Sequence, residues 1–247
     1  MRGFVDMKVT KKLWMLVLLM AMPAMAIASG ASFHLDRAPG NLNDKASLQR
    51  GAQFFAANCL ACHSAAYMRY NRLMDIGMKE EDIRKMLPEG SKLGSTMKAM
   101  MDSESAKAAF SVAPPDLSVI ARSRGTDWLY TYLRSFYVDT ARPNAVNNLL
   151  FPLVAMPNVL GGMQGEQVLQ IEKKEGHEAQ MLKLTTPGSM STAEFDATVA
   201  DLVNYLDFMG EPAKLVRYKL GYIVLGFLFL LLILSYALKI EFWKDIH

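Results

Sequence analysis

The chain has little cysteine. Only two of its 247 residues are cysteines, and both fall within the stretch NCLACHS at residues 58–64. A disulfide-rich secreted scaffold needs several cysteine pairs, so this class is excluded. A zinc site normally takes four ligands, and one Cys-x-x-Cys without a second pair or a paired-histidine motif does not supply them. The scarcity of cysteine therefore points to a single local site.

The central part of the chain also lacks a basic excess. The formal net charge of the whole chain is +3, but residues 29–212 hold 18 Lys and Arg against 21 Asp and Glu, a net charge of −3. The basic excess belongs to the flanks of two apolar segments, one near each end. A nucleic-acid-binding domain is usually basic, so we expect no nucleic-acid partner.

The first apolar segment, LWMLVLLMAMPAMAIA at residues 13–28, follows four basic residues and ends in small residues. This pattern predicts a secretory signal peptide over residues 1–28, with cleavage after Ala26 or Ala28. An uncleaved membrane anchor is the alternative. It is less favoured because the segment is short for a bilayer and is interrupted by Pro23.

The second apolar segment, Leu220 to Leu238, contains no charged residue and has about the 20 residues that a membrane-spanning helix needs. Aromatic residues that favour the membrane interface stand near its ends: Tyr218, Tyr222, Tyr236 and Trp243. Residues 213–247 are therefore predicted to form a transmembrane anchor, spanning about 220–238, with a short tail.

The orientation of this anchor rests on the signal peptide. More basic residues precede the span than follow it, which is the reverse of the positive-inside bias if the preceding domain is exported. Export by a signal peptide nevertheless places residues 29–212 outside the cytoplasm. The sequence thus predicts a single-pass membrane protein with its domain outside the cytoplasm and residues 239–247 inside.

The exported region reads as mainly α-helical with long loops. Asp44 is expected to cap a helix over residues 45–59, and a capping box formed by Ser191 and Glu194 opens a helix that ends at Gly210. A further helix is expected over GTDWLYTYLRSFY, residues 125–137. Prolines, glycines and asparagines make residues 139–165 a long loop, and no strand-rich stretch is evident.

The motif Cys-x-x-Cys-His is best explained as an attachment site for covalently bound haem. Both thiols can add to the haem vinyl groups as thioethers, and the adjacent His63 can then become an axial iron ligand. A thioredoxin-like redox pair expects a βαβ setting, which the helical pattern lacks. A simple disulfide between Cys59 and Cys62 with an incidental histidine remains the alternative. We predict one haem c held by Cys59, Cys62 and His63.

If His63 binds the haem iron on one face, a second side chain could bind it on the other face, or that face could stay open. The remaining histidines lie near the predicted cleavage site, in a charged run and at the end of the chain: His34, His177 and His247. Most methionines are core filler. Met156 stands out because it lies in the proline-marked loop and because Pro157 favours an extended backbone before it. Met163 and Met190 are weaker candidates.

Three stretches and the C-terminal span together make a more specific pattern than the haem motif alone. The stretches are FFAANCLACHSAAYMRYNRL (54–73), APPDLSVIARSRG (113–125) and LLFPLVAMPNVLGG (149–162). With them the chain resembles the cytochrome c1 family, the haem-bearing subunits of ubiquinol:cytochrome c oxidoreductase (the cytochrome bc1 complex).

The resemblance implies a cytochrome c-like haem domain followed by one transmembrane helix. It makes Met156, the methionine before the loop proline, the sixth iron ligand. It also implies that Pro114 and Pro115 pack at the haem edge and that Arg124 lies near a propionate, a plain surface arginine being the equal alternative.

The resemblance further implies a function. The protein would carry single electrons from the Rieske iron-sulfur protein to a c-type cytochrome, with its tail helix beside cytochrome b. It would be an electron-transfer subunit without catalytic residues of its own. Two alternatives remain: a tail-anchored cytochrome that serves another oxidase or dehydrogenase, and an enzyme or gas sensor with five-coordinate haem.

Overall fold

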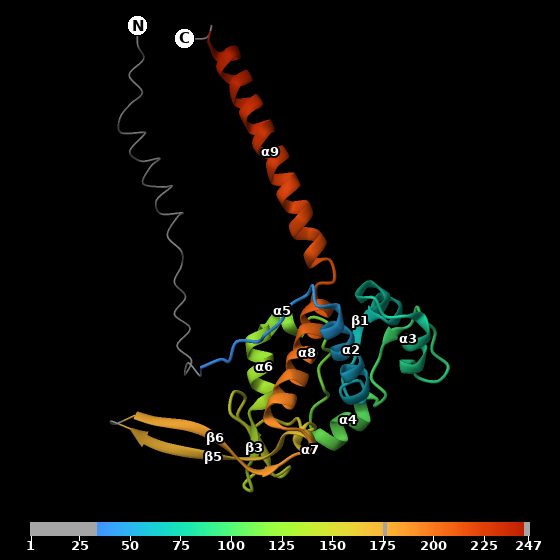
Figure 1. Ribbon diagram of the computed structural model, residues 1–247, viewed down its shortest axis with the longest axis vertical. Helices are drawn as coiled ribbons and strands as arrows, with labels where there is room; N and C mark the ends of the chain where they lie inside the picture. Colours follow the sequence, from blue (N-terminus) through green and yellow to red (C-terminus); the bar gives the residue numbers. More distant parts are fainter. Residues whose placement is uncertain (1–33, 175–176, 245–247) are drawn as a thin grey trace. The chain divides into compact units, whose positions relative to one another are not determined.

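The computed structural model describes residues 34–174 and 177–244, so the predicted signal peptide lies outside the described residues. The described chain is mainly helical, as predicted (Figure 1). Its helices are α2 (Lys45–Asn58), the 3-10 helix η1 (Tyr70–Ile76), α3 (Glu80–Met86), α4 (Ser103–Phe110), α5 (Ile120–Arg124), α6 (Thr126–Arg134), α7 (Gly161–Gln164), α8 (Thr192–Gly210) and α9 (Lys214–Trp243).

The helix termini follow local capping chemistry. Asp44 accepts a hydrogen bond from the backbone N–H of Ser47 at 3.1 Å and so starts α2 where the sequence predicts. Ser191 and Glu194 form the expected capping box at the start of α8, which ends at Gly210. The helix expected over residues 125–137 is shorter than predicted, because α6 ends at Arg134 and a strand begins at Phe136.

The core lies where α2 packs against α8. The two backbones approach closely at Gly51, where a Cβ atom would overlap the carbonyl oxygen of Asp201 and the side chain of Tyr205. Next to this crossing the rings of Phe55 and Tyr205 lie 5.7 Å apart. The same helix α8 also packs against α5 and α6, so it joins the haem-motif helix to the segment that follows APPDLS.

Three two-stranded antiparallel sheets complete the fold: β1 (Ala65–Arg69) with β2 (Thr96–Met97), β3 (Phe136–Val138) with β4 (Val146–Asn148), and β5 (Gly165–Lys174) with β6 (His177–Pro187). The absence of a strand-rich stretch was a wrong prediction, because β5 and β6 pair from Gly165–Pro187 to Lys174–His177. The base of this hairpin is fixed by Gln167, whose amide nitrogen donates to the carbonyl oxygens of Arg134 and Phe136 at 2.9 Å.

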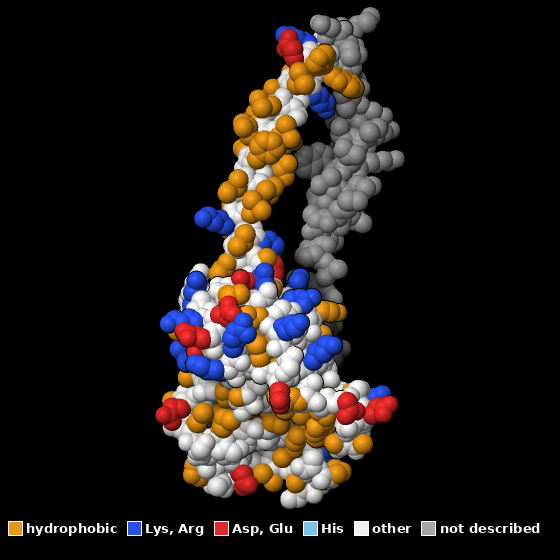
Figure 2. Space-filling model, turned by 90° about the vertical axis from the view of Figure 1, so that its right-hand side faces the viewer, with side chains coloured by type: hydrophobic (Ala, Val, Ile, Leu, Met, Phe, Trp, Pro, Cys, Tyr) orange, Lys and Arg blue, Asp and Glu red, His pale blue; other side chains and the backbone are white. Residues whose placement is uncertain are grey.

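Helix α9 has the length and composition of a membrane span. Its 30 residues correspond to about 45 Å of helix, close to the thickness of a bilayer with its headgroups. None of its side chains is buried, and hydrophobic side chains cover the face of α9 seen in Figure 2. In the described part of the chain, α9 is the one helix that is long and apolar enough to cross a membrane, which fits a membrane-anchored protein.

Candidate functional site

The cysteine motif forms a turn at the end of α2. Cys59 ends the helix, with its backbone N–H donating to the carbonyl oxygen of Phe55 at 2.9 Å, and His63 donates from its backbone N–H to the carbonyl of Cys59 at 2.8 Å. Both thiols are free and partly buried. Burial, aided by the nearby Cys62, raises the pKa of Cys59 to about 12. A protonated thiol does not suit a thiolate redox pair.

The imidazole of His63 is oriented by the APPDLS segment. Its Nδ1 atom lies 2.8 Å from the carbonyl oxygen of Pro115, so Nδ1 carries the proton and donates. Desolvation lowers the pKa of His63, although the bond to Pro115 and the charge of Asp116 oppose this. The ring is therefore neutral with Nε2 as its lone-pair nitrogen, the state that a metal-binding histidine needs.

The same segment holds the turn after His63. Three hydrogen bonds join the two stretches: from Leu117 N–H to the Ser64 carbonyl at 2.8 Å, from Ala66 N–H to the Asp116 carboxylate at 2.8 Å, and from Tyr67 N–H to the Ser118 hydroxyl at 3.0 Å. The PPDLS residues thus have a local structural role, because they set the position of the histidine that follows the cysteines.

Met156 lies on a different loop and contacts α6. Its Sδ atom accepts a hydrogen bond from the hydroxyl of Tyr132 at 3.4 Å. The Tyr132 ring stacks on Trp128 with centroids 4.8 Å apart and planes 10° apart. Cys59, Cys62 and His63 share one turn. The segment 113–134 links this turn to Met156, because His63 contacts it at Pro115 and Met156 contacts it at Tyr132.

The other candidate ligands lie in other parts of the chain. Met163 and Met190 are partly buried and pack against the hydrophobic core, and Met190 also accepts a weak hydrogen bond from Thr198 at 3.8 Å. His34 is exposed in the segment before α2, and His177 begins strand β6. His247 lies outside the described residues.

Arg124 is exposed and stacks on aromatic rings. Its guanidinium carbon lies 5.0 Å from the centroid of Trp128 and 6.0 Å from that of Phe151. A guanidinium at such distances is attracted to the face of an aromatic ring by a cation–π interaction. Through these contacts Arg124 links α6 to the loop that carries Met156. The pairing of Arg124 with a haem propionate stays a prediction.

The donor set suits haem c better than a bare metal ion. Two free thiols could form thioether bonds to the vinyl groups of a c-type haem, and a neutral imidazole and a methionine thioether could bind its iron. Apolar side chains close in sequence to Pro115 and Met156 are exposed and could cover an apolar ring edge: Val112 at 51%, Phe151 at 45% and Leu153 at 68%. Across residues 34–174 and 177–244, no cluster of three or more His, Cys, Asp or Glu could hold a metal ion.

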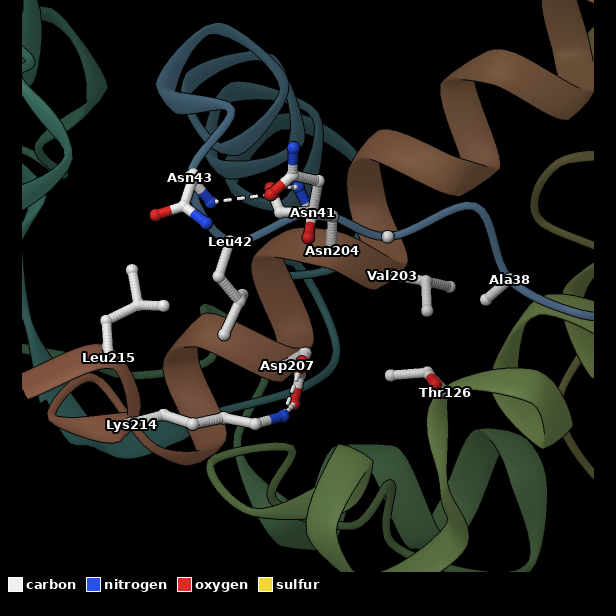
Figure 3. Close-up of a pocket in the computed structure, with 11 residues that line it drawn as sticks. Ala38, Asn41, Leu42, Asn43, Thr126, Val203, Asn204, Asp207, Lys214 and Leu215 are labelled. Atoms are coloured by element: carbon white, nitrogen blue, oxygen red, sulfur yellow. Dashed lines mark hydrogen bonds and ion pairs between the residues drawn. The ribbon is translucent and has the colours of Figure 1, made fainter. Parts of the chain in front are cut away.

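A cavity of about 300 Å³ lies elsewhere, between the segment before α2, the end of α8 and the start of α9 (Figure 3). Asn41, Leu42, Asp207 and Lys214 are among its lining residues, and Lys214 points toward Asp207. None of the four residues predicted to hold the haem lines it. The cavity is therefore not part of the predicted haem site.

Sequence reasoning missed two contributors to the site, the hydroxyl of Tyr132 and the carbonyl of Pro115. Tyr132 falls within the helix expected over residues 125–137, and a position in a helix does not indicate which loop its side chain will contact. The proline was expected only to pack at the haem edge. Its role as hydrogen-bond acceptor depends on a backbone atom, which side-chain patterns do not report.

The chain is similar to known proteins over nearly its whole length. The Cytochrome C1 family model matches residues 36–96 and 89–246. Cytochrome c1 of Allochromatium vinosum is 46% identical over 243 residues, covering 96% of this chain and all of that protein. A Nitrosomonas europaea protein named ammonia monooxygenase gamma subunit is 52% identical over 237 residues, covering 96% of this chain and 98% of that protein.

A more distant relative is the mitochondrial cytochrome c1 haem protein of Schizosaccharomyces pombe, 28% identical over 229 residues and covering 82% of this chain and 68% of that protein. The family model and the two named cytochromes c1 agree, so the oxygenase name of the Nitrosomonas relative is not carried over. Near-complete coverage of the bacterial relatives leaves little of the chain unmatched. The chain belongs to the cytochrome c1 family, whose members carry a covalently bound haem c in respiratory electron transport.

Proposed function

We propose that this chain is the electron-carrying haem subunit of a ubiquinol:cytochrome c oxidoreductase. It would receive single electrons from a Rieske iron-sulfur protein and pass them to a c-type cytochrome. The observation that carries the proposal is the hydrogen bond from His63 Nδ1 to the Pro115 carbonyl beside two free cysteines. It fixes the tautomer that presents Nε2 to an iron ion.

Each residue of the site has a separate task in this proposal. Cys59 and Cys62 would hold the haem through thioether bonds, and His63 and Met156 would bind its iron. When bound, haem c supplies a one-electron couple that needs no substrate. Met156 would raise the potential relative to a second histidine, because a thioether sulfur is a soft ligand that favours ferrous iron.

The proposed partners and location follow from the family and from α9. In this proposal α9 packs beside cytochrome b, and residues 29–212 lie on the periplasmic side of the bacterial inner membrane. The exposed apolar surface of α9 supports a lipid or protein environment along its length, since so large an apolar surface is rare in water.

Replacement of Met156 by alanine tests the ligand set. We expect the ferric protein to lose the weak charge-transfer absorption typical of methionine ligation, the reduction potential to fall, and the reduced protein to bind carbon monoxide. The matched control is Met163→Ala, which removes a partly buried methionine from the same region and should leave all three properties unchanged. An unchanged spectrum in Met156→Ala would overturn the assignment of this ligand.

Purification of the native complex in mild detergent tests the partners. Cytochrome b and a Rieske protein should co-purify with this chain, and quinol should reduce its haem. Recovery of the haem chain with an oxidase or another dehydrogenase, without cytochrome b, would favour the alternative of a tail-anchored electron carrier for a different enzyme.

A further inference from the structure

The loop before Met156 is held by a fully buried asparagine. Asn148 is 0% exposed, and its amide nitrogen donates to the backbone carbonyl of Tyr132 at 2.8 Å. Its amide oxygen accepts from the backbone N–H groups of Leu150 at 3.0 Å and Phe151 at 3.1 Å. One side chain therefore joins the last turn of α6 to the loop that carries Met156.

The next part of the loop has an unfavourable backbone conformation that two other side chains restrain. Leu153 has a φ of +62°, which is uncommon for a bulky residue. Its N–H donates to the Asn147 side chain at 2.8 Å, and its carbonyl accepts from the Arg142 guanidinium at 3.1 Å. The backbone three residues before Met156 is thus fixed on both sides.

Tyr132 contacts this loop at two points. Its carbonyl accepts the hydrogen bond from Asn148, and its hydroxyl donates to the Met156 sulfur at 3.4 Å. The ring is fixed between Trp128, stacked at 4.8 Å, and Phe136, edge-on at 5.2 Å.

We propose that Tyr132 and Asn148 are positioning residues for the Met156 thioether, with Asn148 fixing the loop against α6 and the Tyr132 hydroxyl orienting the sulfur. The proposal rests on the proposed function, because it takes Met156 as an iron ligand. A hydrogen bond to the sulfur withdraws electron density from it, which weakens its donation to ferric iron and favours the ferrous state. Tyr132 would then tune the potential as well as the geometry.

A purely structural role for these residues is the competing explanation, so the test compares each variant with a matched control. Tyr132→Phe removes the hydroxyl and keeps the ring. Its control is Tyr130→Phe, on the same helix, whose ring packs against Arg134. Asn148→Ala is compared with Asn204→Ala, which removes another buried amide with two hydrogen bonds, to Asn41 and Ser47, far from the loop in sequence.

The measurements are made on the full-length, haem-loaded protein in detergent. We expect Tyr132→Phe to lower the reduction potential and shift the methionine charge-transfer band, while Tyr130→Phe changes neither. We expect Asn148→Ala to speed carbon monoxide binding to the reduced protein on the order of tenfold, the factor expected when a buried hydrogen bond is lost. Asn204→Ala should lower the unfolding midpoint without this change in binding.

The outcomes separate this inference from the proposed function. If Met156→Ala leaves the spectrum unchanged, the ligand assignment fails and the inference fails with it. If Met156→Ala loses the methionine signature but Tyr132→Phe and Asn148→Ala behave like their controls, only the positioning inference is overturned. Should Asn148→Ala fail to fold, Tyr132→Phe decides alone, since the loss of one hydroxyl leaves the ring packing in place.

Discussion

At the scale of single residues, Asp116 connects the PPDLS segment to the turn after His63. Both of its carboxylate oxygens accept backbone hydrogen bonds, one from Ala66 and one from Ser118, each at 2.8 Å. Burial opposes ionisation here, but hydrogen bonds from Ser118 and Ala66 outweigh it and lower the pKa of Asp116 below its ordinary value of 3.8. The charged form therefore stabilises the fold.

Asp116→Asn should destabilise the protein by about 1 kcal/mol at pH 7, because the amide must turn its NH₂ group toward one of the two N–H donors. The pKa is lowered on folding, so this contribution is present above about pH 3.8 and is lost as the pH falls through the folded pKa. Urea unfolding of both proteins, at pH 7 and in a series of more acidic buffers, measures the difference.

The matched control for this prediction is Asp102→Asn at the start of α4. One Asp102 oxygen accepts the two backbone bonds, from Glu104 and Ser105, while the other meets a serine hydroxyl that can reverse its role. Asparagine is nearly as good as aspartate at a helix N-cap. A pH-independent loss in Asp116→Asn, or an equal loss in the control, would contradict the argument.

At the scale of elements, the crossing of α2 and α8 decides where the cysteine motif lies. Gly51 allows the two helix backbones to meet, and the ion pair of Arg50 with Asp201 at 2.5 Å covers the crossing from outside. Eight residues after Gly51, α2 reaches Cys59. The close packing of α2, the helix that ends at Cys59, against α8 therefore depends on the absence of a side chain at Gly51.

Gly51→Ala should cost about 1–3 kcal/mol or more, because the added methyl group overlaps backbone atoms that cannot move independently. The ordinary helix preference for alanine would act in the opposite direction by about 1 kcal/mol. Gly94→Ala, where nothing lies within 4 Å of an added Cβ, should change stability little. Thermal or urea unfolding of the two variants checks this, and equal midpoints would refute the close approach.

Sequence reasoning found the helices better than the strands. The start of α2 and both ends of α8 depend on local capping residues, which the sequence displays directly. The β5–β6 hairpin was missed, although Leu169 and Ile171 alternate with polar residues, as do Leu182 and Leu184. That alternation is short and lies beside the charged run EKKEGHE, so it gives a weaker signal than the helical periodicity elsewhere.

The candidate site divides in the same way. The turn around His63 was predictable because its cysteines and histidine are adjacent in sequence. Met156 was selected by its loop and by family resemblance, since patterns cannot measure the distance between residues 93 positions apart. The contacts of Met156 with Tyr132, and of the loop with Asn148, depend on how α6 and the loop pack, which residue types alone do not reveal.

At the scale of the whole molecule, the junction of α8 and α9 bears on membrane orientation. Only residues 211–213 separate the two helices. Lys214 pairs with Asp207 at 3.0 Å, and Arg217 pairs with Glu211 (Figure 3 shows the first pair). Two of the basic residues that precede the span are thus bound to carboxylates at the end of α8.

The basic flank before the span does not rule out export of the preceding domain. Charge counting alone would put this flank in the cytoplasm, but a long domain is translocated largely regardless of its charges. We therefore predict that alkaline phosphatase fused after Pro212 is active, because it is exported, and that the same enzyme fused after His247 is inactive. A fusion after Pro212 that lacks residues 1–28 is the control and should be inactive. Activity of the His247 fusion would place the tail outside the cytoplasm and reverse the proposed topology of α9.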